Sequence, residues 1–108
     1  MSDSIFLRWH SAQPQEIAPG VRGLVKSGNF LEVGKIFLKA GTELKRHAHL
    51  EEQMFYLLEG RLRYRVGEVE EVAGPGDLIY FPGGIPHGGC VEGDADAVFI
   101  ELKERKGV

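Results

Sequence analysis

The sequence is poor in several residue types on which common enzyme chemistries depend. It has a single cysteine, Cys90, which excludes an internal disulfide, a redox-active cysteine pair and a cysteine-rich zinc module. None of its four serines lies beyond Ser27, far in sequence from any glycine-rich turn that presents a nucleophile, which argues against serine hydrolase chemistry. No apolar run approaches the roughly 18 residues of a membrane-spanning helix. Chemistry must therefore be carried by other side chains.

The chain also lacks an excess of positive charge. Its 13 lysines and arginines are outnumbered by 16 aspartates and glutamates, giving a formal net charge of -3, so binding to a nucleic-acid backbone is not expected. The first residues, Met1 to Ile5, lack the basic and apolar regions of a secretory signal. We therefore expect a cytoplasmic protein that binds neither nucleic acid nor membrane. With 108 residues, 43% of them hydrophobic, residues 1–108 are expected to form one domain.

What the chain has in abundance are turn residues. Fifteen glycines and five prolines divide it into short segments that alternate between apolar and polar residues or form brief apolar runs. This pattern predicts an all-β fold, a small barrel or sandwich. The expected longer strands are Val21 to Val25, Phe30 to Ala40, Gln53 to Leu58, Arg61 to Val66, Leu78 to Phe81 and Ala97 to Leu102, with shorter ones around His47, Val69 to Val72 and His87.

One of these segments alternates strictly. Between Arg61 and Val66, the apolar side chains of Leu62, Tyr64 and Val66 are expected on the core face, and three arginines on the other. The arginines form either a solvated strand face, which discourages edge-to-edge aggregation, or a subunit interface or anion site. Tight turns are expected at Gly67-Glu68 and over residues 74–77.

Three of the four histidines fall in two short segments. His47 and His49 are separated by one residue, which on a strand places both on one face, about 7 Å apart, where both can bind one metal ion. A third, His87, follows Pro82 and a glycine pair and is expected to begin another strand. By itself, the first pair is more often two exposed side chains of a polar stretch than a pair of metal ligands.

The surrounding glycines and prolines resemble the cupin superfamily. Its first motif, G(X)5HXH(X)3-4E(X)6G, is matched by Gly41, His47, His49 and Gly60, with Gln53 where the family usually has Glu. Its second motif, G(X)5PXG(X)2H(X)3N, is matched at the positions Gly76, Pro82, Gly84 and His87, with Val91 where the family has Asn.

The resemblance covers about residues 30–102 and has implications for the fold and the site. It implies a double-stranded β-helix, the jelly-roll barrel of cupins, with His47, His49, Gln53 and His87 as metal ligands inside the barrel. The cofactor would be one divalent transition metal, namely Mn, Fe, Co, Ni, Cu or Zn. A register shift would make Glu52 the fourth ligand instead of Gln53, although strand parity places these two on opposite faces. A cupin that has lost its metal is the remaining alternative.

The fourth ligand and a late carboxylate bear on function. An amide oxygen at Gln53 is neutral, so a bound ion keeps more positive charge and favours an anionic or oxygen-rich substrate. Glu101 interrupts the apolar run Val98 to Leu102 and is either exposed at an edge or turned into the barrel as a general base. Parity does not decide between these, because both faces of the run are apolar.

Among small cupins, those that linearise unsaturated uronates resemble this chain, since they also carry three His and one Gln as ligands. Their acidic residue in the late strand is typically Asp, where this chain has Glu101. The resemblance implies a metal-dependent isomerase or lyase acting on a small sugar acid. The alternatives are a metal-dependent dioxygenase and a barrel that binds a small molecule or metal without turnover. The substrate is expected to meet Phe55, Leu57, Tyr80, Phe81 and Glu101 at the barrel mouth.

Surplus apolar residues in Met54 to Leu58 and Val98 to Leu102 predict a homodimer.

Overall fold

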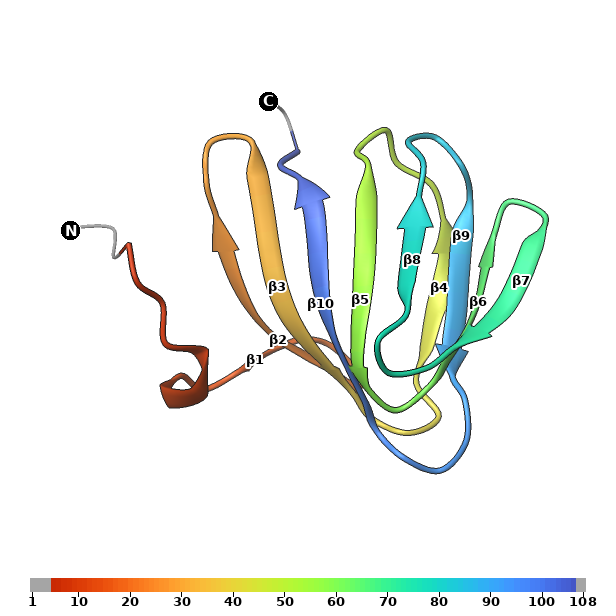
Figure 1. Cartoon of the computed structure of the whole chain (residues 1–108), viewed down its shortest axis with the longest axis horizontal. Helices are drawn as coiled ribbons and strands as arrows, with labels where there is room; N and C mark the ends of the chain where they lie inside the picture. The colour runs from red at the N-terminus through yellow and green to blue at the C-terminus, as the bar shows by residue number, and fades with distance from the viewer. Residues whose placement is uncertain (1–4, 107–108) are drawn as a thin grey trace.

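The computed structural model describes residues 5–106 of the chain, and within them β-strands dominate. One 3-10 turn, η1, precedes ten strands (Figure 1). No helix in this part of the chain has the length and the apolar character needed to cross a membrane. The elements are η1 (Trp9–Ser11), β1 (Gln15–Ala18), β2 (Val21–Ser27), β3 (Leu31–Leu38), β4 (Glu43–His47), β5 (Gln53–Glu59), β6 (Leu62–Val66), β7 (Val69–Ala73), β8 (Leu78–Phe81), β9 (His87–Val91) and β10 (Ala97–Glu104).

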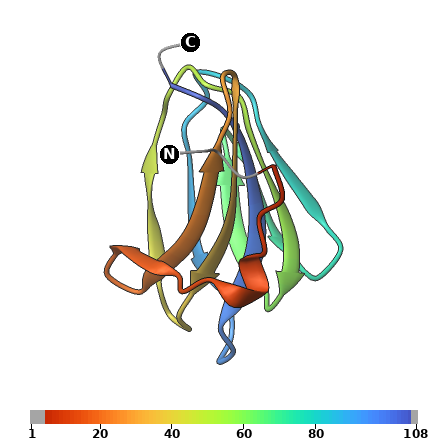
Figure 2. The ribbon, with the colours of Figure 1, turned by 90° about the vertical axis from the view of Figure 1, so that its left-hand side faces the viewer.

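The strands form two packed sheets, which confirms the predicted all-β jelly roll. One sheet has the order β1-β2-β3-β10-β5-β8, and the other has the order β4-β9-β6-β7. The chain changes sheet between β3 and β4 and again between β4 and β5. Figure 2, viewed from the side, shows β4 facing β2 across the gap between the sheets. Residues distant in sequence therefore share one interior.

The interior between the two sheets is packed with apolar side chains. Leu38, Leu57, Leu62, Phe81 and Phe99 are each at most 2% exposed. Aromatic rings fill the space between the sheets, and Phe55 stacks on Phe99 with ring centroids 4.0 Å apart. Burying each such side chain stabilises the fold by about 1.5–3 kcal/mol. Phe81 of this core stacks on His87, so the core extends to the histidines.

The alternation in β6 is confirmed. Leu62 and Tyr64 are buried, while Arg63 and Arg65 are exposed on the other face. There Arg63 forms ion pairs with Glu92 and Glu70, and Arg65 pairs with Glu68. The arginine row is therefore a solvated, ion-paired strand face.

Both expected turns are present. Gly67, between β6 and β7, has φ +59°, and Gly76 in the turn before β8 has φ +92°, a region that side chains with a Cβ rarely adopt. At the second turn the Asp77 carboxylate accepts a hydrogen bond from the Gly74 amide, and the Asp77 amide donates to the Gly74 carbonyl.

The structure corrects two expectations about the strands. The segment Gln15–Ala18, for which no strand was expected, forms β1 at the edge of the larger sheet. Its four residues are all exposed, so it carries no alternation of buried and exposed positions for a sequence pattern to detect. The strand expected over residues 30–40 is shorter, since β3 spans Leu31–Leu38.

Candidate metal centre

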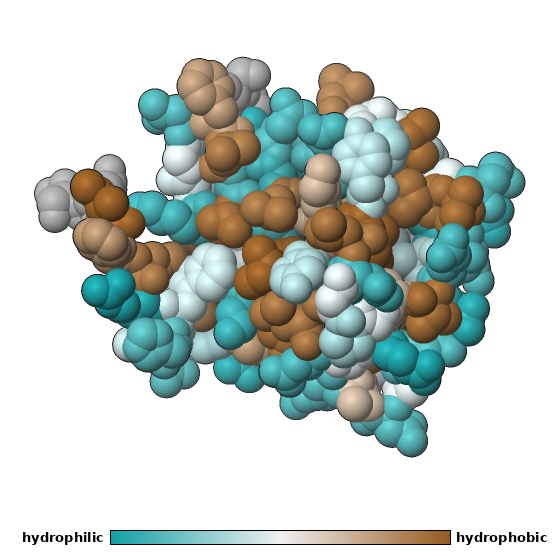
Figure 3. Space-filling model, in the orientation of Figure 1, coloured by the Kyte–Doolittle hydropathy of each residue, from teal (hydrophilic) through white to brown (hydrophobic). Residues whose placement is uncertain are grey.

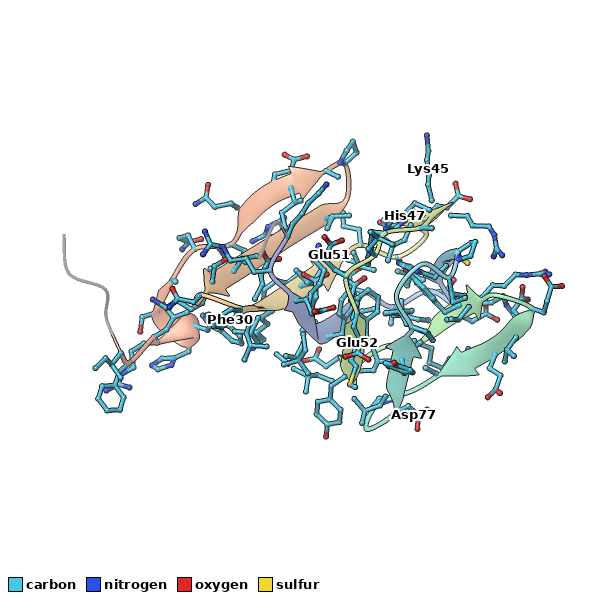
Figure 4. The ribbon with its side chains drawn as sticks, turned by 90° about the horizontal axis from the view of Figure 1, so that it is seen from above. Phe30, Lys45, His47, Glu51, Glu52 and Asp77 are labelled. Carbon is cyan, nitrogen blue, oxygen red and sulfur yellow. The ribbon has the colours of Figure 1, made fainter. Side chains whose placement is uncertain are left out.

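The three histidines come from two strands and one loop. His47 is the last residue of β4 and pairs in register with His87, the first residue of β9. His49 lies beyond β4, in the loop that leads to β5. The expectation that His47 and His49 share one strand is therefore wrong, because β4 ends at His47 and the chain turns there to cross to the other sheet. Figure 4 looks down on this end of the molecule.

The imidazole rings nevertheless meet. One nitrogen from each of His47, His49 and His87 lies within 4.8 Å of the others, so the cluster can hold a metal ion. The ring centroids are 5.4 Å apart for His47 and His49, 4.6 Å for His47 and His87, and 4.8 Å for His49 and His87.

The backbone holds each ring in one orientation. The Nδ1 atoms of His47, His49 and His87 each lie 2.9 Å from a carbonyl oxygen two residues away, at Lys45, Glu51 and Ile85 respectively. A carbonyl oxygen only accepts hydrogen bonds, so each Nδ1 carries the proton. In the neutral ring, Nε2 then has a free lone pair, which is the form that binds metals. The same anchoring contact occurs three times.

Two observations show that these residues fit a metal ion. The Nε2 atom of His87 is buried and has no hydrogen-bond partner in the structure, although a buried polar atom without a partner is costly. The Nε2 atom of His49 lies 3.0 Å from Oε1 of Gln53. Because Nδ1 of His49 is the protonated nitrogen of the neutral ring, this contact joins two lone pairs, and a cation bound to both atoms makes it favourable.

Gln53 is oriented by Glu101. The Nε2 amide of Gln53 donates a hydrogen bond of 2.6 Å to Oε1 of Glu101, which turns the amide oxygen toward the histidines. Gln53 is 6% exposed, whereas the neighbouring Glu52 is exposed and accepts a hydrogen bond from the Tyr80 hydroxyl outside the barrel. The structure thus brings His47, His49, Gln53, His87 and Glu101 together and leaves Glu52 outside the cluster.

The electrostatic setting favours a neutral His87. Burial lowers the pKa of His87 and outweighs the contact with the Ile85 carbonyl, which acts in the opposite direction. The ring also stacks on Phe81, with centroids 4.7 Å apart. An imidazole that stays neutral to lower pH keeps its lone pair available for a metal.

The pKa of Glu101 is raised, whereas that of His87 is lowered. Burial, the largest cause, raises its pKa, and the positive charge of Lys103 partly offsets this effect. The carboxyl group therefore holds a proton at a higher pH than an exposed glutamate. Such a carboxyl group, at a cavity wall beside the candidate metal site, is placed to take up and release protons.

The cluster opens into a cavity of about 640 Å³ between the two sheets. Of the residues expected at the barrel mouth, Phe55 and Glu101 line it, whereas Leu57 and Phe81 belong to the core and Tyr80 is on the outer surface. A separate cleft of about 510 Å³ between β7 and β8 contains none of the clustered histidines. The lining of the larger cavity comprises Ile17, Val21, Val25, Glu32, Ile36, Leu44, Lys45, His47, His49, Gln53, Phe55, Tyr64, Phe99, Glu101 and Lys103.

Sequence reasoning missed one side of this cavity. The wall made by β1, β2 and β3 includes Ile17, Val25 and Glu32, which were not predicted as site residues. The inward positions of β2, at Val21, Gly23 and Val25, alternate with Arg22, Leu24 and Lys26, and this partial alternation with charged residues is the signal that could have identified them. The carbonyl oxygens that anchor the histidines have no sequence signal.

Solved structures with similar folds were found. The chain matches an RmlC-like cupin from Shewanella frigidimarina with a TM-score of 0.88 and 22% identity, over 97% of this chain and 95% of that one. It matches KdgF from Halomonas sp. with a TM-score of 0.85 and 22% identity, over 98% and 97%. A predicted oxalate decarboxylase from Thermotoga maritima matches with a TM-score of 0.83 and 17% identity, over 93% and 98%. At these identities the likeness concerns the fold.

The family itself is established by sequence. No curated protein matches the chain. The family model described as "Cupin domain" matches residues 34–103, which include both predicted motifs and all five residues gathered at the cavity. This match covers more than half of the chain and agrees with the jelly-roll architecture, so the chain belongs to the cupin family.

Proposed function

We propose that the protein is a metal-dependent enzyme of isomerase or lyase type that acts on a small anionic, oxygen-rich substrate. The observation that carries this proposal is the group of three histidines with anchored Nδ1 atoms, beside a half-buried carboxyl group in an open cavity. Three fixed imidazoles support metal binding, and a half-buried carboxyl group next to them supports proton transfer.

In this proposal the ligands are His47, His49, His87 and Oε1 of Gln53. A bound divalent ion would act as a Lewis acid that polarises an oxygen atom of the substrate. Because all four ligands are neutral, the ion keeps its full charge. Lys45 and Lys103 line the same cavity, and so do Glu32 and Glu101, so these side chains carry no net positive charge between them; Lys45 extends away from the barrel (Figure 4). The positive charge of an ion held by four neutral ligands is what supports an anionic substrate.

Glu101 would transfer the proton. Its carboxyl group faces the cavity, and its contact with Gln53 holds it next to the ligand set. A raised pKa is what a group needs if it is to alternate between base and acid during an isomerisation. Sugar acids are the first substrates to test, since they combine a carboxylate with hydroxyl oxygens that a metal binds.

Two measurements test the proposal. Elemental analysis of protein grown without added metals should find about one transition metal per chain. Incubation with an unsaturated uronate should then remove the ultraviolet absorbance of its conjugated double bond, at a rate that falls when the metal is chelated. Metal content without turnover of this or other small carboxylates would favour the non-catalytic binding role, and absence of metal would contradict the proposal.

Replacing Gln53 with alanine should weaken metal binding less than loss of a histidine does. A neutral amide oxygen is a weak donor that water can replace, so we expect a loss on the order of tenfold, the low end for disturbing the surroundings of a metal. Titration of the protein with Zn²⁺ measures the change. Gln13→Ala, an exposed glutamine outside the site, is the control, and a loss for Gln53→Ala as large as for a ligating histidine would contradict this ordering.

We further propose that two copies associate through the outer face of the larger sheet. Figure 3 shows hydrophobic residues across the middle of the face presented in Figure 1. Tyr56, Leu78, Tyr80 and Leu102 on this face are each more than 40% exposed, and Tyr56 is paired in register with Leu78 and with Ile100. A two-fold contact of about 800 Å² per copy has the size of a stable interface and would cover such a patch.

Light scattering should therefore give about twice 12.0 kDa at micromolar concentration. Leu102→Glu places a charge in the proposed contact and should shift the protein toward monomer, because a buried unpaired charge is strongly unfavourable. Leu50→Glu, at a residue that is 85% exposed in the loop between β4 and β5, should not. A monomeric unmodified protein would overturn the dimer.

A further inference from the structure

The cavity has two chemically different halves. His47, His49, Gln53 and Glu101 occupy one half, and the rest of the lining, apart from Glu32, Lys45 and Lys103, is mainly apolar, with Ile17 on β1, Val21 and Val25 on β2, Ile36 on β3 and Phe99 on β10. We infer that the ligand of this site is amphipathic, with an anionic head that binds at the metal and a hydrocarbon portion that lies against β1, β2 and β3. This inference rests on the proposed metal-dependent function and narrows its anionic substrates to those that also carry a hydrocarbon portion, in preference to fully hydroxylated sugar acids.

The apolar wall begins directly beside the polar group. In the register of the larger sheet, Glu101 is paired with Gly34, and Gly34 is paired with Val25. Gly34 has no side chain, and a Cβ atom at this position would come within 3.3 Å of both Ile36 and Val25. The space across from Glu101 is therefore bounded by two aliphatic side chains.

A second glycine extends the same wall. Gly23 on β2 is paired with Ile36, and a Cβ atom here would lie 2.6 Å from Cδ1 of Ile17 and 2.9 Å from Cδ1 of Ile36. Ile17 thus reaches across β2 to lie next to Ile36. Two glycines and the isoleucines over them form a continuous hydrocarbon surface.

Part of this surface is exposed. Ile17 is 56% exposed and Val25 is 48% exposed, although both line the cavity. A hydrocarbon group that enters the cavity removes this apolar surface from water, which is favourable. A sugar acid with a hydroxyl group on every carbon would instead place hydroxyls against the side chains of Ile17, Val25 and Ile36, which offer no hydrogen-bond partner, and this is costly. The wall therefore favours a carboxylate with an alkyl or ring substituent over a fully hydroxylated one.

A series of alkyl hydroxamates of increasing length, from acetohydroxamate to hexanohydroxamate, tests this inference. The hydroxamate head chelates metals, and only the chain varies. The full chain loaded with Zn²⁺ is titrated by calorimetry. Burial of one methylene contributes about 0.8 kcal/mol, so the affinity should rise about threefold to fourfold with each methylene. The heat-capacity change on binding should become more negative along the series.

A pair of matched variants locates the binding surface. Val25→Thr keeps the shape of the side chain and adds a hydroxyl to the wall, so it should reduce the gain for each methylene while leaving the affinity for acetohydroxamate unchanged. Val69→Thr makes the same change at an exposed valine outside this cavity and should leave the whole series unchanged. Light scattering is measured on both variants.

The outcomes separate this inference from the proposed function. Equal affinities along the series in Zn²⁺-loaded protein would overturn the amphipathic ligand and leave the metal site intact. Failure to bind Zn²⁺ would overturn the proposed function itself. A change in the molar mass of Val25→Thr would mean that a second copy, not a ligand, covers the wall, and would also overturn the inference.

Discussion

Replacing His47 with alanine is expected to weaken metal binding by at least about 100-fold. Disturbing a residue that only orients a metal ligand costs about 10- to 100-fold in affinity, and this change removes a proposed ligand itself. His47 is exposed at the end of β4, so the substitution leaves the core unchanged. Competition with a chromophoric chelator measures the affinity, and elemental analysis measures the metal retained on purification.

His47 is a better position for this test than His87. The side chain of His87 is 1% exposed and stacks on Phe81, so its loss would also leave a hole in the interior. His10→Ala, at an exposed histidine of η1, is the matched control and should retain full metal content. If His47→Ala also kept its metal, the ion would not be held by the three-histidine cluster.

The sequence allowed the group of three histidines to be predicted, because the spacing of possible ligands within each short segment can be read directly from the sequence. His47 and His49 are two residues apart. His87 follows a turn rich in proline and glycine and is the first residue of β9. The expected reason for their convergence was wrong, since His49 is not on a strand. What brings the rings together is the register of β4 with β9 and the carbonyl contacts at each Nδ1, neither of which is encoded by residue type.

The orientation of Glu101 shows why strand parity alone could not decide whether its side chain faces the interior of the barrel or solvent. Alternation identifies the inner face of a strand only when the outer face is polar. In β10 both Val98 and Phe99 are buried although adjacent residues of a strand point to opposite faces, and so the run is apolar on both faces. Only the pairing of Glu101 with Phe55 and Gly34 in the assembled sheet places its carboxyl group inside.

The edge strand β1 shows a further limit to what can be predicted from the sequence. Its residues are exposed, and its hydrogen bonds go only to β2, so no pattern of burial distinguishes it from a loop. Yet it supplies Ile17 to the cavity wall. Residues that matter for ligand choice can therefore lie on segments whose sequence carries no strand signal.

Glu101→Gln should lower kcat by about 10²- to 10⁴-fold on the substrate that the enzyme turns over, the usual contribution of a general acid or base. Glutamine has nearly the same shape as glutamate, and its carbonyl oxygen can still accept the hydrogen bond from Nε2 of Gln53. Metal content should therefore stay near that of the unmodified protein. Loss of metal together with activity would instead assign Glu101 the role of positioning Gln53.

The pH dependence of kcat distinguishes a catalytic role of Glu101 from a purely structural one. Burial raises the pKa of Glu101, and the base form is the carboxylate, so kcat should rise as the pH increases through this raised pKa. Glu101→Gln should lose that limb of the profile. The Glu101 carboxyl group is more acidic in the unfolded chain than in the folded protein, so its ionisation lowers the free energy of unfolding as the pH rises. Glutamine does not ionise, so at neutral pH Glu101→Gln should be at least as stable as the unmodified protein. Thermal unfolding at pH 7 measures this stability. A destabilised variant with an unchanged pH profile would show that Glu101 serves the fold and not the reaction.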